Sequence, residues 1–309
     1  MSVRAIPGRL LLLASAAAVA TGIVAWVGMR QVGADFWHAA WAIPIAILVH
    51  ALQLAISGRA WRRLLAPRAP GQARVAMLRW VREAINSMLP VAQIGGSVAA
   101  VRMLAQSGMS LTAATAGTTL DVMIESGAMA PLVLLALVLL GAGQPVALAG
   151  GFGALLLGLG GFFAVQRLGL FRLAERFGLP GLHDALLALH GDFRRLSGSF
   201  LWHLAAWLLG TAETWAALFA MGAHVPLRDA FILETLGMVA RSAGFAVPGA
   251  LGVQEAGFVL VGQLVGIPAD AAITVSMIKR VRELAVGVPG LILWQAMEGR
   301  RLVRRARSA

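Results

Sequence analysis

The sequence contains no cysteine and few charged residues. Without cysteine the chain has no disulfide bond, no thiolate nucleophile and no cysteine-based zinc or iron–sulfur site. Six scattered histidines on their own do not predict a metal site. Only 13% of the residues are charged and 59% are hydrophobic, against averages of about 25% and about 45–50% in soluble proteins. This composition excludes an ordinary soluble enzyme, a disordered protein and a coiled coil.

Long apolar runs dominate the chain, and the mean hydropathy is +0.80. A membrane-spanning helix needs about 20 apolar residues, and 309 residues leave little room beside such helices for a soluble domain. We therefore expect an all-α polytopic membrane protein with a single transmembrane domain over residues 1–309. Six runs predict full transmembrane helices: Leu10–Val27, Phe36–Ile56, Ala113–Leu140, Val146–Val165, Phe200–Met221 and Ala271–Trp294.

The first run, Leu10–Val27, has two alternative interpretations. It follows Arg4 and Arg9 and contains the small residues Ala14-Ser15-Ala16, which are features of a cleavable signal peptide. The run is about 18 residues long, however, whereas the apolar core of a signal peptide usually has about 7–15. We interpret it as a retained first span.

The net charge of +12 comes mainly from arginines that lie outside the apolar runs. They gather before the first run, in the loops 57–75 and 166–198, and in the tail 296–309. Basic segments beside transmembrane helices lie on the cytoplasmic side, so both termini and both loops are predicted to be cytoplasmic. Orientation and attraction to anionic lipids explain the charge, and no nucleic acid is expected as a partner.

This orientation leaves two segments that must enter and leave the membrane on the same face. They are Ala76–Ala105, which is interrupted by Pro90 and Gly95-Gly96, and Phe231–Val265, which is interrupted by Pro248-Gly249-Ala250-Leu251-Gly252. Neither interrupted segment provides two uninterrupted spans of about 20 residues. The pattern therefore predicts two re-entrant helical hairpins, the first opening to the cytoplasm and the second to the outside.

The chain also matches itself at an offset of 158 residues, without a gap over the matched stretch. Each copy reads as a broken hairpin, a turn containing glycine, and a span with ionisable residues. Because the two hairpins open to opposite faces, we predict an inverted repeat with copies at about 36–140 and 200–295. The matched pairs are Pro90 with Pro248, Gly108 with Gly266, Ala113-Ala114 with Ala271-Ala272, Thr118 with Ser276, Glu125 with Glu283, and Pro131 with Pro289.

Ionisable residues are unusually common within the predicted membrane segments. Each would cost a few kcal/mol facing lipid, so they must face one another, a wet cavity or a substrate. Asp121 is replaced by Lys279 across the repeat, which suggests an ion pair between them. A structural ion cluster and a headgroup-binding cavity are both open interpretations. Bases and acids balance seven to seven: Arg79, Arg82, Arg102, Arg241, Lys279, Arg280, Arg282, Glu83, Asp121, Glu125, Glu213, Glu234, Glu255 and Glu283.

Two stretches resemble the lysylphosphatidylglycerol synthase transmembrane, or flippase-like, family. The first stretch has Gly95-Gly96, Arg102, Gly108 and Ala113-Ala114, and the second has Arg241, Pro248-Gly249-Ala250-Leu251-Gly252-Val253-Gln254-Glu255 and Gly266. The resemblance implies an integral inner-membrane protein with re-entrant helices that handles polar lipids. It does not extend to the soluble aminoacyl-transfer domain, for which the chain has no room. In size the chain is similar to stand-alone members, including some associated with hopanoid biosynthesis.

The position of Asp121 and Glu125 departs from the pattern expected of this family. Many relatives are expected to have a basic residue there, so the preferred headgroup stays open. The charges and the resemblance together predict the residues that bind the headgroup. These are Arg82, Glu83, Arg102, Asp121, Glu125, Arg241, Gln254, Glu255, Lys279, Arg280, Arg282 and Glu283.

The function expected from these observations is that of a lipid flippase or transporter of a bacterial inner membrane, with membrane lipids as its partners. No metal motif, nucleophile elbow or acid–base pair suited to catalysis is evident, so we expect no enzymatic activity and no cofactor. Two alternatives stay open. One is a membrane-embedded enzyme acting on a lipid, and the other is an accessory or scaffold protein that binds lipid-biosynthesis enzymes.

Overall fold

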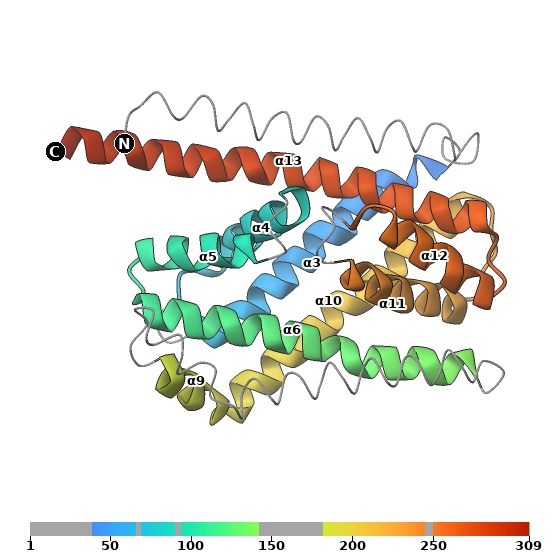
Figure 1. Cartoon of the computed structure of the whole chain (residues 1–309), viewed down its shortest axis with the longest axis horizontal. Coiled ribbons are helices and arrows are strands. Elements are labelled where there is room, and N and C mark those ends of the chain that lie inside the picture. Colours follow the sequence, from blue (N-terminus) through green and yellow to red (C-terminus); the bar gives the residue numbers. More distant parts are fainter. Residues whose placement is uncertain (1–38, 66–68, 90–93, 142–181, 245–249, 309) are drawn as a thin grey trace.

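The computed structural model describes residues 39–65, 69–89, 94–141, 182–244 and 250–308. Within these ranges the chain forms nine α-helices and no strand, which confirms the all-α prediction (Figure 1). The predicted spans Leu10–Val27 and Val146–Val165 lie outside the described residues, as do Pro90 and Pro248.

The helices of the first half follow the apolar pattern closely, apart from one boundary. Helix α3 begins at Ala42 and continues past the predicted end at Ile56 because its last turn carries Arg62 and Arg63. Cations are favourable at a helix C-terminus, so these arginines extend the helix and do not mark a loop. The helices are α3 (Ala42–Leu65), α4 (Gln72–Met88), α5 (Gly95–Gln106) and α6 (Leu111–Leu140).

The helices of the second half include much of what was predicted as loop and tail. The side chain of Asp192 accepts a hydrogen bond from the backbone N–H of Arg195 and so caps the start of α10 inside the predicted loop 166–198. The predicted span Ala271–Trp294 is part of a longer helix that continues through the tail. The helices are α9 (Leu182–His190), α10 (Phe193–Ala220), α11 (Leu227–Ala243), α12 (Val253–Leu264) and α13 (Ala269–Ser308).

Two short helical hairpins occur where the breaks in the sequence predict them. Helix α4 packs against α5, and α11 packs against α12. In Figure 1 the connection from α5 to α6 lies at one end of the long axis, and the connection from α12 to α13 lies at the other. The two hairpins therefore enter from opposite ends of the molecule. Their depth in a membrane stays a prediction.

The helix boundaries repeat at the offset seen in the sequence. Helix α5 begins at Gly95 and α12 begins at Val253, 158 positions later, and both have 12 residues. Helix α6 begins at Leu111 and α13 at Ala269, again 158 positions apart.

The turns that follow α5 and α12 also share their geometry. Gly108 and Gly266 have φ angles of 96° and 73°, which L side chains rarely adopt. The next residue in each copy donates its N–H back into the preceding helix: Met109 to the carbonyl of Leu104 at 3.4 Å, and Ile267 to that of Gly262 at 2.8 Å. Both helices thus end in the same glycine-terminated motif.

Two of the described helices are long and apolar enough to span a membrane by length and composition, namely α3 with 24 residues and α6 with 30. Helices α10 and α13 are also long, but they contain buried charged residues such as Glu213 and Lys279. The count of six spans therefore stays a prediction.

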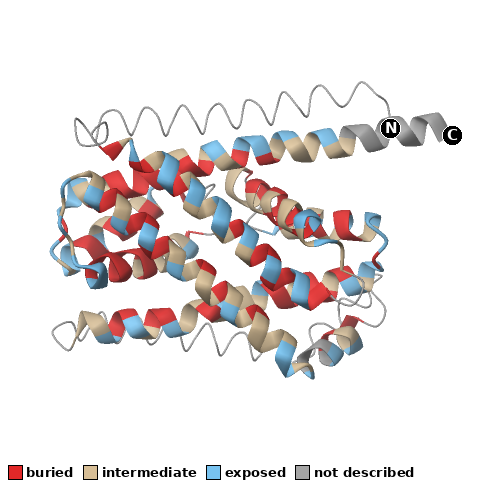
Figure 2. Ribbon diagram, turned by 180° about the vertical axis from the view of Figure 1, so that it is seen from behind, coloured by how far each residue is buried: buried red, intermediate tan, exposed pale blue. Residues whose placement is uncertain are grey.

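Buried residues gather where the helices pack on one another (Figure 2), and small residues there allow a close approach. In α5, Gly96 donates its N–H to Oδ1 of Asn86 at 2.8 Å, and a Cβ atom at Gly96 would collide with the carbonyl oxygen of Arg82. In α13, a Cβ atom at Gly290 would meet Ala84 and the ring of Trp80 on α4. Close packing of this kind holds helices together where lipid removes the hydrophobic drive.

Replacing Gly96 with alanine tests the contact between α4 and α5. The added methyl group collides with backbone as well as with a side chain, so we expect Gly96→Ala to lose about 1–3 kcal/mol of stability. In α6, a Cβ atom at Gly127 meets nothing within 4 Å, so Gly127→Ala should be neutral or stabilise by about 0.4–1 kcal/mol. Thermal unfolding in detergent measures both, and equal midpoints for the two variants would contradict the close packing.

Candidate functional site

Six helices, α3, α4, α6, α10, α11 and α13, surround a cavity lined largely by ionisable side chains. Its volume of about 120 Å³ has room for several water molecules. The lining is unusual because the outer surfaces of the same helices are apolar, with exposed residues such as Leu48 and Val138. The ionisable lining residues are His50, Arg79, Glu83, Glu125, His203, Glu234, Arg241, Lys279, Arg282 and Glu283.

A first ion network joins α4 to α6. Both guanidinium ends of Arg79 donate to the carboxylate of Glu125, one of them at 2.8 Å. Arg82 donates to Oδ2 of Asp121 at 2.6 Å and approaches Glu125 at 3.4 Å. The side chains of Arg82 and Asp121 are almost completely buried, and a buried pair of this kind persists only when both charges are compensated.

Aromatic and histidine side chains hold the first network in place. Nε2 of His203 on α10 lies 2.9 Å from Oδ1 of Asp121. The guanidinium of Arg82 stacks over the ring of Trp61 at 5.6 Å from its centroid. Trp207 donates its ring N–H to the backbone carbonyl of Glu125 at 3.1 Å. The ion pairs are therefore fixed from α3, α6 and α10 as well as from α4.

A second network joins α13 to α10 and α11. Nζ of Lys279 lies 2.8 Å from Oε2 of Glu234 and 3.5 Å from Oε1 of Glu213. Arg282 donates to the other oxygen of Glu213 at 2.7 Å. Thr214 donates its hydroxyl to Glu234. Two cations and two carboxylates thus compensate one another in the buried part of the molecule.

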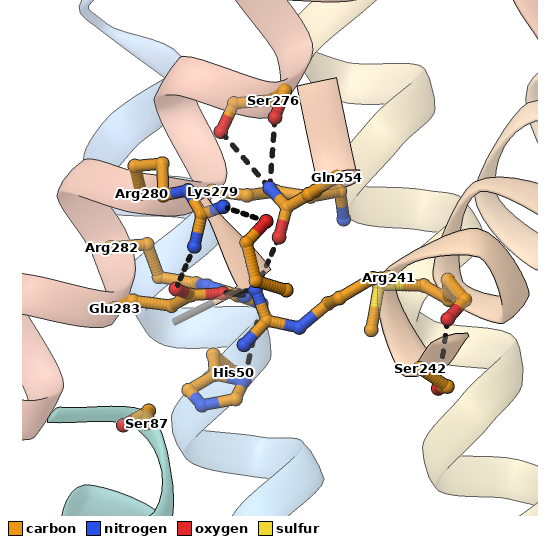
Figure 3. A network of polar contacts seen from close by, with 12 residues as sticks. His50, Ser87, Arg241, Ser242, Gln254, Ser276, Lys279, Arg280, Arg282 and Glu283 are labelled. Atoms are coloured by element: carbon orange, nitrogen blue, oxygen red, sulfur yellow. Dashed lines mark hydrogen bonds and ion pairs between the residues drawn. The ribbon is translucent and has the colours of Figure 1, made fainter. Parts of the chain in front are cut away.

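A third network ties the second hairpin to α13 (Figure 3). Arg241 on α11 lies 2.8 Å from Glu283 and donates to the side-chain oxygen of Gln254. Arg280 lies 3.0 Å from Glu255, which is in the first turn of α12. The loop before α12 and the start of that helix are therefore held by two arginines from different helices.

Two further hydrogen bonds complete this third network. Arg280 donates to the backbone carbonyl of Ala250 at 3.0 Å, and Gln254 donates its amide N–H to the hydroxyl of Ser276 at 2.8 Å. Glu255 also accepts the backbone N–H of Gly252 at 2.7 Å. Glu255 thereby satisfies one of the free backbone N–H groups at the start of α12.

The structure brings most of the predicted site residues together. One predicted residue is misplaced: Arg102 has a side chain that is 62% exposed, and it pairs at 2.9 Å with Glu298 outside the cavity lining. It lies on the outer side of α5 because the inner side packs on α4 through glycine and alanine. The residues in the three networks or on the cavity wall are Arg82, Glu83, Asp121, Glu125, Arg241, Gln254, Glu255, Lys279, Arg280, Arg282 and Glu283.

The predicted ion pair between Asp121 and Lys279 is wrong. Asp121 pairs with Arg82 and is contacted by His203, whereas Lys279 pairs with two glutamates of the second network. Arg82 lies on α4, His203 and Glu213 lie on α10, and Glu234 lies on α11. The counter-charge of each residue therefore comes from other helices that surround the cavity and not from the equivalent position in the other half.

Several residues of the site were not among the predicted headgroup-binding residues. Arg79, Glu213 and Glu234 were recognised as membrane charges but not assigned to the site, and His50 and His203 line the same cavity. The spacing of polar residues could have indicated this cavity, because such residues recur on one face of otherwise apolar helices. On α3 the recurring residues are His50, Gln53 and Ser57, and on α10 they are His203, Trp207 and Thr214.

The arrangement suits the binding of a polar group that carries charge. The cavity presents guanidinium, ammonium and carboxylate groups within a short reach of one another, so it can replace part of the hydration shell of a headgroup. Within the described ranges, no group of three or more His, Asp or Glu side chains is placed to hold a metal ion.

A double-mutant cycle tests the pairing in the first network. Asp121→Asn leaves Arg82 buried without its closest carboxylate, and we expect a loss of about 3–5 kcal/mol. Adding Arg82→Gln should recover part of this loss, because neighbouring charges couple by about 0.5–3 kcal/mol. Adding Lys279→Gln should instead lower stability further. Unfolding in detergent measures each step, and recovery with Lys279→Gln alone would contradict the observed networks.

Comparison of the sequence with known proteins identifies the family of the chain. No curated protein and no solved structure matches the chain. A family model described as the lysylphosphatidylglycerol synthase TM region matches residues 12–290. This range includes both hairpins, α6 and the buried charges of α13 from Lys279 to Glu283, and the family is one of membrane proteins related to lipid handling. Since the match covers most of its 309 residues, the chain belongs to the lysylphosphatidylglycerol synthase TM region family.

Proposed function

We propose that the protein moves lipids across a bacterial inner membrane by binding their polar headgroups in the charged cavity. One observation carries the proposal: a cavity lined by cations and carboxylates lies inside helices whose outer surfaces are apolar. Lipid tails can stay in the surrounding bilayer while the headgroup occupies a polar, water-accessible site. Family membership supports a role in lipid handling.

The proposed architecture has six spans, two re-entrant hairpins and both termini in the cytoplasm. The hairpins enter from opposite ends of the molecule, and the helix boundaries repeat at an offset of 158 residues. Both features support an inverted repeat, in which two copies of one unit face opposite sides of a membrane around a central site. Such a design gives a headgroup access from either side in turn.

In this proposal Arg241, Lys279 and Arg282 bind the anionic part of a headgroup, because all three line the cavity beside carboxylates that can release them. Glu83 and Glu125 line the same space and offer acceptors to hydroxyl or amine groups. The protein acts by exchanging its internal ion pairs for pairs with the ligand. We propose no bond-making or bond-breaking step.

Single cysteines test the proposed orientation, since the natural chain has none. Cysteines at Gly71 and Ser107 should react with a membrane-impermeant thiol reagent only from the cytoplasmic side. Cysteines at Arg228 and Asp270 should react only from outside, and all four positions are exposed. Labelling of Ser107→Cys from outside would turn the first hairpin into a full crossing and remove the inverted repeat.

Translocation is tested in proteoliposomes that contain fluorescent phosphatidylglycerol or phosphatidylethanolamine. Arg241→Gln removes a cation from the cavity, and a hydrogen bond to a charged group contributes about 1.5–3 kcal/mol, so translocation should slow at least about tenfold. Arg102→Gln is the matched control, because Arg102 lies outside the cavity lining, and it should keep the natural rate.

Two results would contradict this function. The first is that the natural protein moves neither lipid faster than protein-free liposomes do. The second is that Arg241→Gln translocates lipid as fast as Arg102→Gln. The second result, with translocation intact, would leave the charged cavity as a structural ion cluster only.

A further inference from the structure

The three ion networks and the cavity wall do not balance in charge. Counting arginine, lysine, aspartate and glutamate side chains, six cations face seven carboxylates, so these groups carry one excess negative charge. The cations are Arg79, Arg82, Arg241, Lys279, Arg280 and Arg282. The carboxylates are Glu83, Asp121, Glu125, Glu213, Glu234, Glu255 and Glu283.

The excess charge can be assigned to Glu83. Each of the other six carboxylates lies within 3.0 Å of a cationic nitrogen. The carboxylate of Glu83 reaches only Nη2 of Arg79, at 3.9 Å, and Arg79 is already bound to Glu125. In the described part of the chain the carboxylate of Glu83 therefore has no hydrogen-bonded counter-ion.

Glu83 lies on the cavity wall together with residues of the first and second networks. It lines the cavity with a side chain that is 34% exposed, so water in the cavity can reach it. It attracts Arg79 of the first network and Arg282 of the second. The other ionisable groups that face the cavity are His50 from α3, Glu125 from α6, His203 from α10, Glu234 and Arg241 from α11, and Lys279 and Glu283 from α13.

We propose that Glu83 is the binding site of a coupling cation, and that this cation is a proton. The reaction is the transfer of a proton from a hydronium ion in the cavity to the carboxylate, which becomes a neutral carboxyl group and leaves a water molecule. A metal cation would need several ligands, and among the described residues no three His, Asp or Glu side chains are placed to hold one. Ser87, the neighbouring hydroxyl, donates to the backbone carbonyl of Glu83 and not to its side chain.

Protonation changes the cavity in two ways. The six cations and the six remaining carboxylates then carry no net charge, so the excess negative charge no longer has to be held in an apolar environment. The attraction of Glu83 for Arg79 and Arg282 is also lost, which weakens the electrostatic link between α4 and α13, two helices that pack together. A proton on Glu83 thus favours separation of the first network from the second, and its release favours closure.

This inference rests on the proposed translocation function, because a coupling ion requires a transported lipid. The proposed function names the residues that bind the headgroup, whereas this inference names the residue that binds the coupling proton. Two measurements separate them: one follows the proton itself and does not need translocation, and the other follows lipid movement under a pH gradient.

The proton is followed by infrared spectroscopy of the full-length protein in detergent as the pH is lowered. The natural protein should show a protonated carboxyl band that Glu83→Gln lacks and that Glu83→Asp retains at a shifted position. Glu298→Gln is the matched control, since Glu298 is an acid of α13 that lies outside the cavity lining and pairs with Arg102. It should keep the band.

Coupling is followed with the fluorescent lipids in proteoliposomes under an imposed pH gradient. The gradient should speed translocation by the natural protein and by Glu298→Gln several-fold, whereas Glu83→Gln should translocate at a rate that does not respond to it. Glu83→Asp should respond, because it still carries a titratable carboxyl group.

Each outcome bears on one of the two claims. A carboxyl band that persists in Glu83→Gln, or translocation by that variant that still responds to the gradient, would overturn the assignment to Glu83 and place the proton on another group. A natural protein that moves neither lipid but shows the Glu83-dependent band would overturn the proposed function and leave the proton site standing.

Discussion

A buried charge in an apolar helical protein must be met by an opposite charge or by a ligand, and the arrangement of the helices follows from that constraint. Arg82 fixes α4 to α6 through Asp121, and Lys279 fixes α13 to α11 through Glu234. Lipid supplies no hydrophobic drive between helices. The ion pairs, together with close glycine contacts such as that of Gly96, therefore decide which helix faces sit against one another.

Helices and breaks were largely predictable because they depend on local chemistry. The run Ala113–Leu140 predicts α6 within two residues, since Ser110 caps its start and Gly141 follows its end. The end of α3 was not predictable from apolar content alone. Arg62 and Arg63 look like a loop in the sequence, but they extend the helix because a helix C-terminus favours cations.

The composition of the site was predictable to a greater extent than its pairing. A charge inside an apolar segment must point inward, and Glu283 and Arg241 indeed line the cavity. The partner of each charge depends on how neighbouring helices are rotated, and no local signal carries that information. For this reason Asp121 was assigned the wrong partner, and Arg102, which sits on the outer side of a short helix, was assigned to the wrong place.

The charge reversal between the two halves has a consequence for how such a protein can arise. At the offset of 158 residues Asp121 matches Lys279 and Glu83 matches Arg241, and the two residues of each matched pair carry opposite charges. In a symmetric dimer of identical subunits, equivalent positions carry the same residue, so neither reversal could exist there. Opposite charges at matched positions therefore require two units of different sequence, and a single chain that contains both units provides them.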